Sequence, residues 1–447
     1  MESGEVLERV QREGLALVRF LYCDNANIVR GKATTLTNLG DFIGAGIGLT
    51  MAMQGFTPTE RIATDASVGP IGEIRLVPDP ATYVLLPYAP RQAAMLCDMV
   101  TLSGEPWDLC PRAALRRVLD SAAADGLVVQ VGFEHEFYLL SRGNEGWVPF
   151  DRSLCFSTRG MNGAGPVILD ILDALDAQGL KAVQYYPELG PGQQELSMDH
   201  TAALRAADEA IIARETIRGV AEAHGLAASF APKPFIDQAG SGSHIHLSVW
   251  KAGTNAFYAG ADPLGLAPLA YSFIAGILVH LPGLLALTCP SLNSYQRLAP
   301  GMWSSAFVCY GPDNREAAVR IASPFRGREE ASTNIELKAI DGSANPYLAL
   351  AGVIAAGLDG VRRGLSPGEA IRTNPGSMSD EQRAAAGIGR FPSTPLVAGR
   401  ALQGDTILKE AIGSHIVEEA LSVRRSEVAD LDGLEPREMA KRYLSFY

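Results

Sequence analysis

Val-Gly-Phe-Glu-His-Glu-Phe-Tyr-Leu-Leu, residues 131–140, places two glutamates one residue apart inside an apolar run. Successive side chains of a β-strand point to opposite faces, so Glu134 and Glu136 share one face while Phe133 and Phe137 share the other. Carboxylates are costly in so apolar a segment unless they are paired or bound to a metal. The stretch therefore predicts a strand that aims two acidic ligands at one side of a sheet.

The same theme recurs further along the chain. Glu188 and Glu195 stand in Pro-Glu-Leu-Gly-Pro-Gly-Gln-Gln-Glu, His244 and His246 in Gly-Ser-Gly-Ser-His-Ile-His-Leu-Ser, and Glu336 in Asn-Ile-Glu-Leu-Lys. Alone, a Glu-x-Glu on a half-exposed strand is usually a solvated face, and a His-x-His pair is as often a satisfied core histidine as a weak metal clip. Together, the five carboxylates and two imidazoles favour one cavity lined by hard metal ligands.

The length and charge of the chain bound its class. At 447 residues it can bury a large core and is long enough for two or more domains. A hydrophobic content of 47% with 20% charged residues is ordinary for a globular enzyme. The formal net charge of -12 disfavours nucleic acid or an anionic membrane as the main partner.

Cysteine usage and the N-terminus indicate the compartment. The six cysteines include no Cys-x-x-Cys pair, and the first residues lack the basic and apolar regions of a signal peptide. We therefore expect reduced thiols and a cytoplasmic protein. The longest apolar stretch, residues 264–289, contains His280 and Pro282 and is followed by Pro290. It predicts a packed helix pair rather than a transmembrane span.

Turn and periodicity signals divide the chain near residue 105. Residues 1–105 predict a short helix at 3–13 and a small β-rich unit, with strands at 15–22, 73–77 and 82–87. Residues 106–447 predict an α+β domain whose sheet carries the acidic residues on one face. Its predicted helices are 113–124, 165–178, 200–224, 345–363 and 401–424, with irregular surface at 365–396.

Six motifs, in order, resemble the glutamine synthetase family over nearly the whole chain. They are the paired glutamates at 134–136, Glu-x-Gly-Pro-Gly-Gln-x-Glu at 188–195, Lys233-Pro234 with Gly-Ser-Gly-x-His-x-His at 240–246, Asn-Ser-Tyr-x-Arg-Leu-x-Pro-Gly at 293–301, Asn-Arg-x-Ala-x-Val-Arg at 314–320, and Ile-Glu-Leu-Lys with Ala-Asn-Pro-Tyr at 335–347. The resemblance implies a small N-terminal β-grasp-like domain, 1–105, and a larger catalytic α/β domain, 106–447, with a curved antiparallel sheet. It also implies a homo-oligomer of stacked rings with active sites between subunits.

The resemblance further implies ATP and two to three Mg²⁺ or Mn²⁺ ions as cofactors. Two ligand sets follow from it: Glu136, Glu188 and Glu195 around one ion, and Glu134, His244 and Glu336 around another. Carboxylate-rich sets suit such ions, which bridge phosphate oxygens and offset charge as a phosphoryl group transfers.

Other residues acquire expected roles from the same resemblance. Contacts with the nucleotide phosphates are expected from His246, Ser248 and Arg320. Phosphoryl transfer is expected to involve Arg315, Arg320 and Glu136. Substrate binding is expected at Arg297, Gly240, Lys338 and Trp303. Arginine suits the bidentate contacts with phosphate and carboxylate that these roles require.

Family members transfer the γ-phosphate of ATP to the side-chain carboxylate of glutamate, and an amine then attacks the acyl phosphate to leave an amide. A free carboxylate is a poor acylating agent. Phosphorylation supplies the leaving group, while the site shields the intermediate from water.

The chain departs from the ammonia-using members at the ammonium site. Those members place an acid six residues after the Arg of Asn-Ser-Tyr-x-Arg, where this chain has Trp303, and an Asp-Gly-Ser-Ser element in the N-terminal domain, where residues 50–57 hold no acid. Ala239 stands where an Asn usually precedes Gly-Ser-Gly, and Lys338 replaces an Arg. An indole cannot serve as the base that deprotonates ammonium.

These departures resemble the glutamine-synthetase-like branch that makes γ-glutamyl amides. We expect an ATP-dependent ligase that joins the γ-carboxylate of glutamate to an organic primary amine, an arylamine or a small alkylamine. The alternatives are an ordinary glutamine synthetase, a γ-glutamylpolyamine synthetase and a non-catalytic scaffold. Trp303 argues against the first, the lack of replacement acids against the second, and the intact buried acidic cluster against the third.

Overall fold

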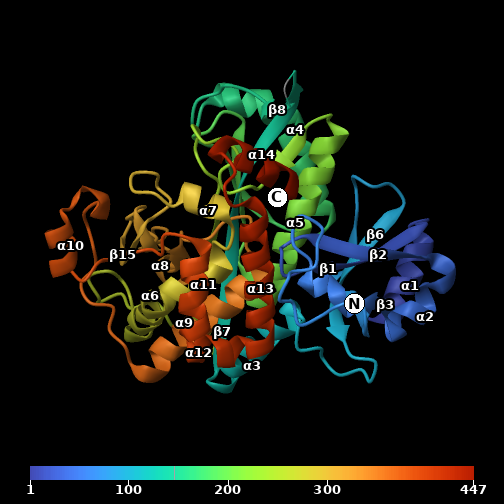
Figure 1. Ribbon diagram of the computed structural model, residues 1–447, viewed down its shortest axis with the longest axis horizontal. Helices are drawn as coiled ribbons and strands as arrows, with labels where there is room; N and C mark the ends of the chain where they lie inside the picture. Colours follow the sequence, from blue (N-terminus) through green and yellow to red (C-terminus); the bar gives the residue numbers. More distant parts are fainter. Residues whose placement is uncertain (145) are drawn as a thin grey trace.

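The computed structural model describes residues 1–144 and 146–447, and it is built on two sheets (Figure 1). The smaller sheet belongs to the β-grasp-like N-terminal domain and has the strand order β2-β1-β6-β4-β3, with β5 paired to β6. β1 and β6 pair in parallel, and the other pairs are antiparallel. Its elements are α1 (Ser3–Arg12), β1 (Leu17–Cys23), β2 (Val29–Thr35), α2 (Leu36–Ala45), β3 (Ile47–Thr50), β4 (Glu73–Pro78), β5 (Val84–Leu85) and β6 (Gln92–Val100).

The larger sheet runs through the C-terminal part of the chain in the order β18-β15-β16-β17-β13-β7-β10-β9. Its pairs are antiparallel, as predicted, except that β15 and β16 are parallel, so the sheet is mixed. The 17-residue β7 is its spine and also pairs with β8, β11 and β12. The strands are β7 (Leu127–Gly143), β8 (Gly146–Pro149), β9 (Ala182–Pro187), β10 (Gln193–Met198), β11 (Thr201–Ala202), β12 (Ala227–Ser229), β13 (Ser243–Lys251), β14 (Thr254–Asn255), β15 (Phe307–Pro312), β16 (Ala317–Ile321), β17 (Ile335–Leu337) and β18 (Gly389–Arg390).

Helices surround this sheet, and the predicted ones are confirmed with shifted ends, apart from the last. The predicted helix at 401–424 is wrong as one element, because Asp405 caps a new helix and Gly413, at φ +115°, breaks the next. The segment 365–396 is not wholly irregular, since it contains a short helix, and the final helix was not predicted. The helices are α3 (Pro111–Ala124), α4 (Thr158–Ala177), α5 (Ala203–Ala223), α6 (Pro268–Thr288), α7 (Leu292–Arg297), α8 (Glu329–Ser332), α9 (Pro346–Arg363), α10 (Asp380–Ala385), α11 (Pro395–Gly404), α12 (Thr406–Ile412), α13 (Ser414–Leu431) and α14 (Pro436–Phe446).

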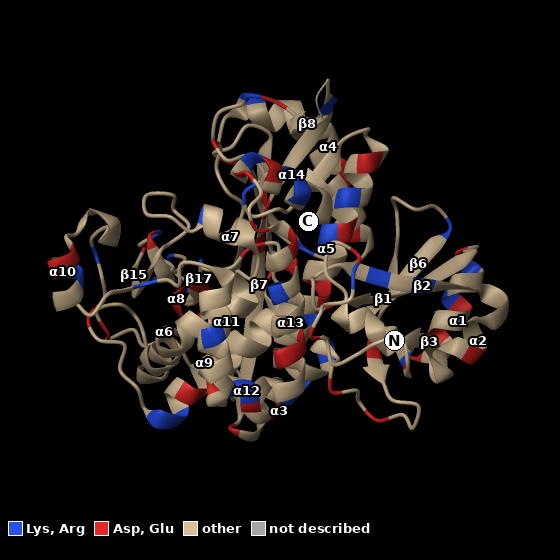
Figure 2. Cartoon of the chain, viewed as in Figure 1, with Lys and Arg blue, Asp and Glu red and all other residues tan. Residues whose placement is uncertain are grey.

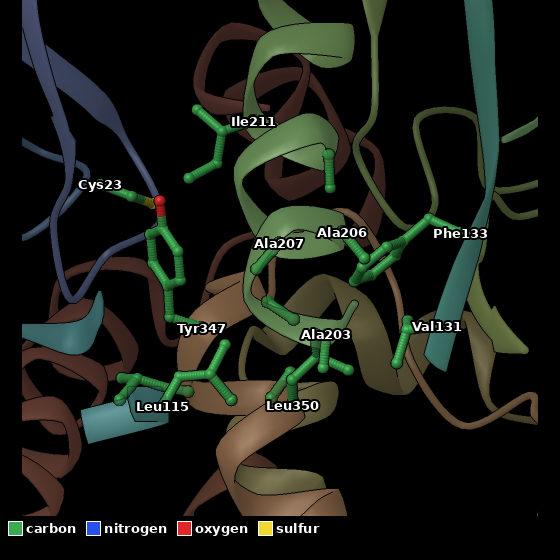
Figure 3. Close-up of a cluster of buried hydrophobic side chains, with 14 of the residues drawn as sticks. Cys23, Leu115, Val131, Phe133, Ala203, Ala206, Ala207, Ile211, Tyr347 and Leu350 are labelled. Atoms are coloured by element: carbon green, nitrogen blue, oxygen red, sulfur yellow. The ribbon is translucent and has the colours of Figure 1, made fainter. Parts of the chain in front are cut away.

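The core lies between the sheet and its helices, and α5 is at its centre (Figure 3). One side of α5 presents small residues, among them Ala203 and Ala206, toward Val131 and Phe133 of β7. Small side chains allow helix and sheet to approach closely, and each buried large side chain contributes about 1.5–3 kcal/mol. This packing fixes the apolar face of β7, so the opposite face is left to carry the acidic residues.

Among the described residues, one helix, α6, is long and apolar enough to cross a membrane, with a mean hydropathy of 1.8 and 67% of the window buried. The predicted helix pair is wrong, because α6 continues through Pro282 as a single helix. It packs tightly against α9: a Cβ at Gly276 would lie 2.0 Å from the Ala356 carbonyl oxygen, and one at Gly360 2.0 Å from that of Ser272. The apolar length of α6 is therefore used in helix packing.

A buried charge network ties the two domains together. Arg112 of α3 binds Asp79, which directly follows β4, Asp98 of β6 and Asp208 of α5, at 2.7, 2.9 and 2.9 Å. We propose a domain boundary near residue 105, between β6 and α3. Figure 2 shows basic and acidic residues interspersed over both domains in this view.

Candidate active site

Strand register brings the predicted ligands onto one face of the large sheet. On β7, Glu134 lies opposite His244 of β13, and Glu136 lies opposite Glu195 of β10. On β17, Glu336 lies opposite both His246 of β13 and Arg320 of β16. Side chains directly opposite on neighbouring strands are about 4.5–5.5 Å apart at Cβ. The alternation inferred from residues 131–140 therefore extends across four further strands.

Glu134, His244 and Glu336 form a compact ligand set. One ligand atom from each residue lies within 4.8 Å of the others. His244 Nδ1 is 3.4 Å from a Glu134 oxygen and 3.5 Å from a Glu336 oxygen. Two carboxylates and a neutral imidazole nitrogen are a suitable donor set for Mg²⁺ or Mn²⁺. These residues fit the metal that the resemblance implies.

Neighbouring groups hold the two carboxylates of this set ionised. The Glu336 carboxylate contacts Arg320 Nη1 at 2.5 Å and Lys338 Nζ at 3.1 Å. Burial acts to raise the pKa of Glu336, but the charge of Lys338 and its other cationic neighbours holds that pKa at about 2. Burial likewise opposes ionisation of Glu134, while hydrogen bonds from His244 and His246 hold its pKa well below the usual range. Both carboxylates are thus ionised at neutral pH and available to a metal ion.

The second predicted set, Glu136, Glu188 and Glu195, has the opposite electrostatics. Burial, reinforced by Glu136, raises the pKa of Glu188 to about 7. Burial and the nearby Glu134 and Glu136 raise that of Glu195 well above its ordinary value, although the Tyr186 hydroxyl donates to it. In the part of the chain that the structure describes, neither Glu188 nor Glu195 forms a salt bridge. A bound cation would supply the charge that these carboxylates lack.

A cavity of about 520 Å³ joins both sets. All six predicted metal ligands line it. Glu188 is half-buried, and the neighbouring Leu189, which also lines the cavity, is exposed. The predicted substrate and phosphate residues in its wall are Gly240, Arg297, Trp303, Arg315, Arg320 and Lys338. His246 and Ser248 lie on the same face of β13 but outside the lining. Ser248 is buried, and its Oγ accepts a hydrogen bond from Trp250 at 3.0 Å.

The basic wall is preformed. Arg297 is buried, with Nη1 on the Ile340 carbonyl at 3.2 Å and Nη2 on His244 Nε2 at 3.3 Å. Gly240 leaves room for it, since a Cβ there would lie 2.7 Å from Arg297 Cγ. Glu136 is fixed from the same loop, because the Gly242 N–H donates to it at 2.8 Å. The glycines of Gly-Ser-Gly thus permit close packing of the backbone against side chains that line the cavity.

The exposed end of the cavity, here called the mouth, is formed by Phe156, Leu189, Met302 and Trp303. Phe156 and Trp303 are 61% and 58% exposed, and both have a φ of +57°. A bulky residue in the left-handed region is strained, and such strain is concentrated at functional sites. Phe156 also packs edge-on against Tyr186, with ring centroids 4.9 Å apart. The mouth therefore presents exposed aromatic side chains that are not part of the hydrophobic core.

Similarity to known proteins agrees with this geometry. Residues 1–107 match the glutamine synthetase N-terminal domain, and residues 108–443 match the glutamine synthetase catalytic domain. The chain belongs to the glutamine synthetase family. Members of this family are ATP-dependent ligases, and this member is therefore an ATP-dependent carbon–nitrogen ligase.

Its relatives include a gamma-glutamylpolyamine synthetase and glutamine synthetases. The gamma-glutamylpolyamine synthetase GlnA3 of Streptomyces coelicolor is 36% identical, over 96% of this chain and 93% of its own. The glutamine synthetase of Methanocaldococcus jannaschii is 32% identical, over 96% and 95%. Two solved structures superpose closely: a novel glutamine synthase homolog, with a TM-score of 0.87, 32% identity and coverage of 97% and 99%, and GmaS with ADP, with a TM-score of 0.85, 29% identity and coverage of 96% of each chain.

The N-terminal element of this glutamine synthetase family member lies away from its own cavity. Residues Met51–Gly55 form a short 3-10 helix in which Gln54 is fully buried, and its main-chain oxygen accepts a hydrogen bond from Asn25 at 2.9 Å. Among the described residues, those lining the cavity all come from positions 134–338. Residues 50–57, which hold no acid, therefore do not line the cavity of their own subunit.

The contributors to the cavity that were not predicted from the sequence include Phe156, Tyr186 and Gln193. Gln193 donates to Glu136 at 3.3 Å and to the Gly240 carbonyl at 2.9 Å. Its position between the two glutamates of residues 188–195 was a usable signal. Phe156 carries no periodic signal, since it lies in the connection between β8 and α4. Its left-handed backbone is visible only in the fold.

Proposed function

We propose that this protein joins the γ-carboxylate of glutamate to an apolar primary amine, with ATP activating the acid as γ-glutamyl phosphate. The observation that carries the proposal is the composition of the cavity wall. Its mouth is aromatic and apolar, and in the described residues its only carboxylates are the five predicted metal ligands. No acid is left over to bind or deprotonate ammonium.

The polar part of the wall supports the activation step. Glu134, His244 and Glu336 would hold one divalent ion, and Glu136, Glu188 and Glu195 another. Two to three Mg²⁺ or Mn²⁺ ions would neutralise the phosphate charge of ATP. Arg315 and Arg320 line the cavity and are suited to stabilise charge on the transferring phosphoryl group. His246 and Ser248 remain expected nucleotide contacts.

The glutamate end is assigned to Arg297, with Gly240 and Lys338 beside it. Arg297 is buried and oriented by main-chain carbonyls, so it would meet a carboxylate with little loss of side-chain entropy. Lys338 keeps a positive charge near the same carboxylate but lacks the forked geometry of arginine.

The amine end distinguishes the candidate substrates. A neutral amine, such as an arylamine, needs no base to become nucleophilic, and its hydrocarbon would lie against Trp303 and Phe156. An alkylamine requires water or another group to take its proton. A polyamine is the second candidate, because a relative is a gamma-glutamylpolyamine synthetase. Its second ammonium group would meet only an apolar mouth, which disfavours it.

Subunit assembly would complete the site. Because no N-terminal residue lines the described cavity, we propose a homo-oligomer of stacked rings in which the N-terminal domain of a neighbour closes the mouth.

All six cysteines are free, which supports the proposed cytoplasmic location.

The test is ATP-dependent phosphate release by the purified protein with glutamate and a panel of ammonium, methylamine, isopropylamine, ethanolamine, putrescine and aniline. Mass spectrometry should identify the amide product. We expect the highest kcat/KM with an apolar amine. The highest value with ammonium would overturn the proposal, and the highest with putrescine would favour the polyamine alternative.

A further inference from the structure

Glu316 anchors the loop that carries Trp303. It is buried in the turn between β15 and β16. One carboxylate oxygen accepts the Trp303 N–H at 2.8 Å, and the other accepts the Gly301 N–H at 3.1 Å. The same loop is tied at a second point, because Ser304 Oγ donates to the Arg297 carbonyl at 2.8 Å.

The loop needs such an anchor. Gly301, Trp303 and Ser305 have φ values of +76°, +57° and +68°. Left-handed backbone is strained for tryptophan and persists only where the surroundings hold it. Successive N–H groups in such a turn form an anion-binding concavity, and here the anion is the Glu316 carboxylate. Charge-assisted hydrogen bonds of this kind are stronger than neutral ones.

Glu316 also connects the two ends of the cavity. It follows Arg315, which lines the cavity, and its own N–H donates to Asn314 Oδ1 at 3.1 Å. Asn314 is in turn held by the carbonyls of Ile371 and Thr373 at 2.9 and 3.1 Å. The short turn between β15 and β16 therefore carries both Arg315, which is assigned to the phosphate, and Glu316, which anchors the loop of Trp303.

We propose that Glu316 is a positioning residue for amine specificity, which it sets by holding Trp303 in its left-handed conformation at the mouth. The inference rests on the proposed function. Glu316 does not line the cavity, and both of its oxygens are used by main-chain N–H groups, so it is not a substitute for the missing base. It acts through Trp303.

The test compares Glu316→Gln with a matched control, Asp262→Asn. Glutamine offers a single acceptor oxygen, and its amide group would face an N–H donor, so one anchor is lost. Asp262 lies outside the cavity lining and accepts the Leu264 and Leu266 N–H groups at 2.8 and 3.1 Å, and the Tyr271 hydroxyl at 2.8 Å, all on Oδ1. Asparagine keeps that oxygen, so this control removes a carboxylate charge without removing an anchor. For Glu316→Gln we expect the KM of the preferred amine to rise about tenfold, with kcat and the KM of glutamate little changed.

A second measurement reads the loop directly. Acrylamide quenching of Trp303 fluorescence, isolated by subtracting a Trp303→Phe background, should increase in Glu316→Gln and stay constant in Asp262→Asn. A fall in kcat with an unchanged amine KM and unchanged quenching would overturn the proposal, as would equal effects in the control. If the wild type prefers ammonium, the proposed function fails, but quenching and the KM of the amine that does react still decide the role of Glu316.

Discussion

The metal end and the mouth of the cavity differ in how their side chains are placed. At the metal end, Glu134, Glu136, Glu195, His244 and Glu336 project from paired strands, and their spacing follows from strand register. At the mouth, Phe156, Leu189, Met302 and Trp303 lie on connections outside the sheet. Register constrains the first group to one geometry, whereas loops can vary without disturbing the sheet. We infer that the sheet supplies the phosphoryl chemistry and that the loops select the amine.

The largest expected effect comes from the metal end. Glu188→Ala should lower phosphate release by more than about a hundredfold, because even outer partners of metal ligands typically cost 10–100-fold when removed. The thermal midpoint should stay close to the wild type, since Glu188 is half-buried and forms no salt bridge with any other described residue. Glu222→Ala, an exposed change on α5, is the control. Wild-type activity in EDTA would contradict the metal assignment.

A somewhat smaller effect is expected at the phosphate wall. Arg315→Ala should reduce kcat by about 10²–10³-fold while leaving the glutamate KM nearly unchanged, because its contact develops with charge in the transition state. Arg326→Ala, an exposed arginine outside the cavity lining, should be silent. If Arg315→Ala raised only the glutamate KM, its role would be ground-state binding.

At the mouth the expected effect is smaller and depends on the amine. Phe156→Ala should lower kcat/KM for an apolar amine about tenfold, the amount that loss of partly buried aromatic area implies. Ammonium-dependent turnover should not change. Leu154→Ala removes a neighbouring exposed apolar side chain that does not line the cavity and is the matched control. An equal loss for both amines would place Phe156 outside the amine site.

The smallest effect on activity is expected at His280, a buried histidine outside the cavity that is paired with two carboxylates. His280 contacts Asp405 at 2.5 Å and Asp359 at 3.1 Å. Burial acts to lower the pKa of His280, but these two carboxylates outweigh it and raise that pKa. The contribution of these ion pairs to the free energy of unfolding should be complete below the pKa of His280 in the unfolded chain, about 6.5. It should be lost as the pH rises through the higher pKa of His280 in the folded protein.

Thermal melts of the wild type and His280→Gln test this pair. The difference in unfolding free energy, about 1 kcal/mol at low pH, should shrink with increasing pH, while kcat/KM at neutral pH is unaffected. A difference that grows with pH would show that the sign is wrong.

How much the sequence could predict follows the same division. The face of the large sheet that carries the predicted ligands was predictable. Alternation along residues 131–140 indicates which side chains share a face, and the other motifs indicate which segments form the neighbouring strands. The α5 helix was predictable for the same reason, since its apolar spacing is long and regular. Both depend on local periodicity.

The errors arise where long-range packing overrides local signals. Pro282 and His280 indicated a break in α6, yet α9 packs along the whole helix and keeps it continuous. β6 was not predicted because its residues 92–100 are nearly all buried and so show no alternation. Phe156 could not be placed, because its left-handed backbone follows from the path between β8 and α4 rather than from neighbouring residues.

The central claim is that the mouth sets the preference for an apolar amine, and Trp303→Glu tests it most directly. The ratio of kcat/KM for an apolar amine to that for ammonium is measured in the wild type and the variant under identical ATP and glutamate concentrations. The wild-type ratio should favour the apolar amine, and the variant should shift it toward ammonium by about tenfold or more, because a carboxylate replaces the stacking surface and can accept a proton. A wild type that prefers ammonium, or a ratio that the substitution leaves unchanged, would contradict the account.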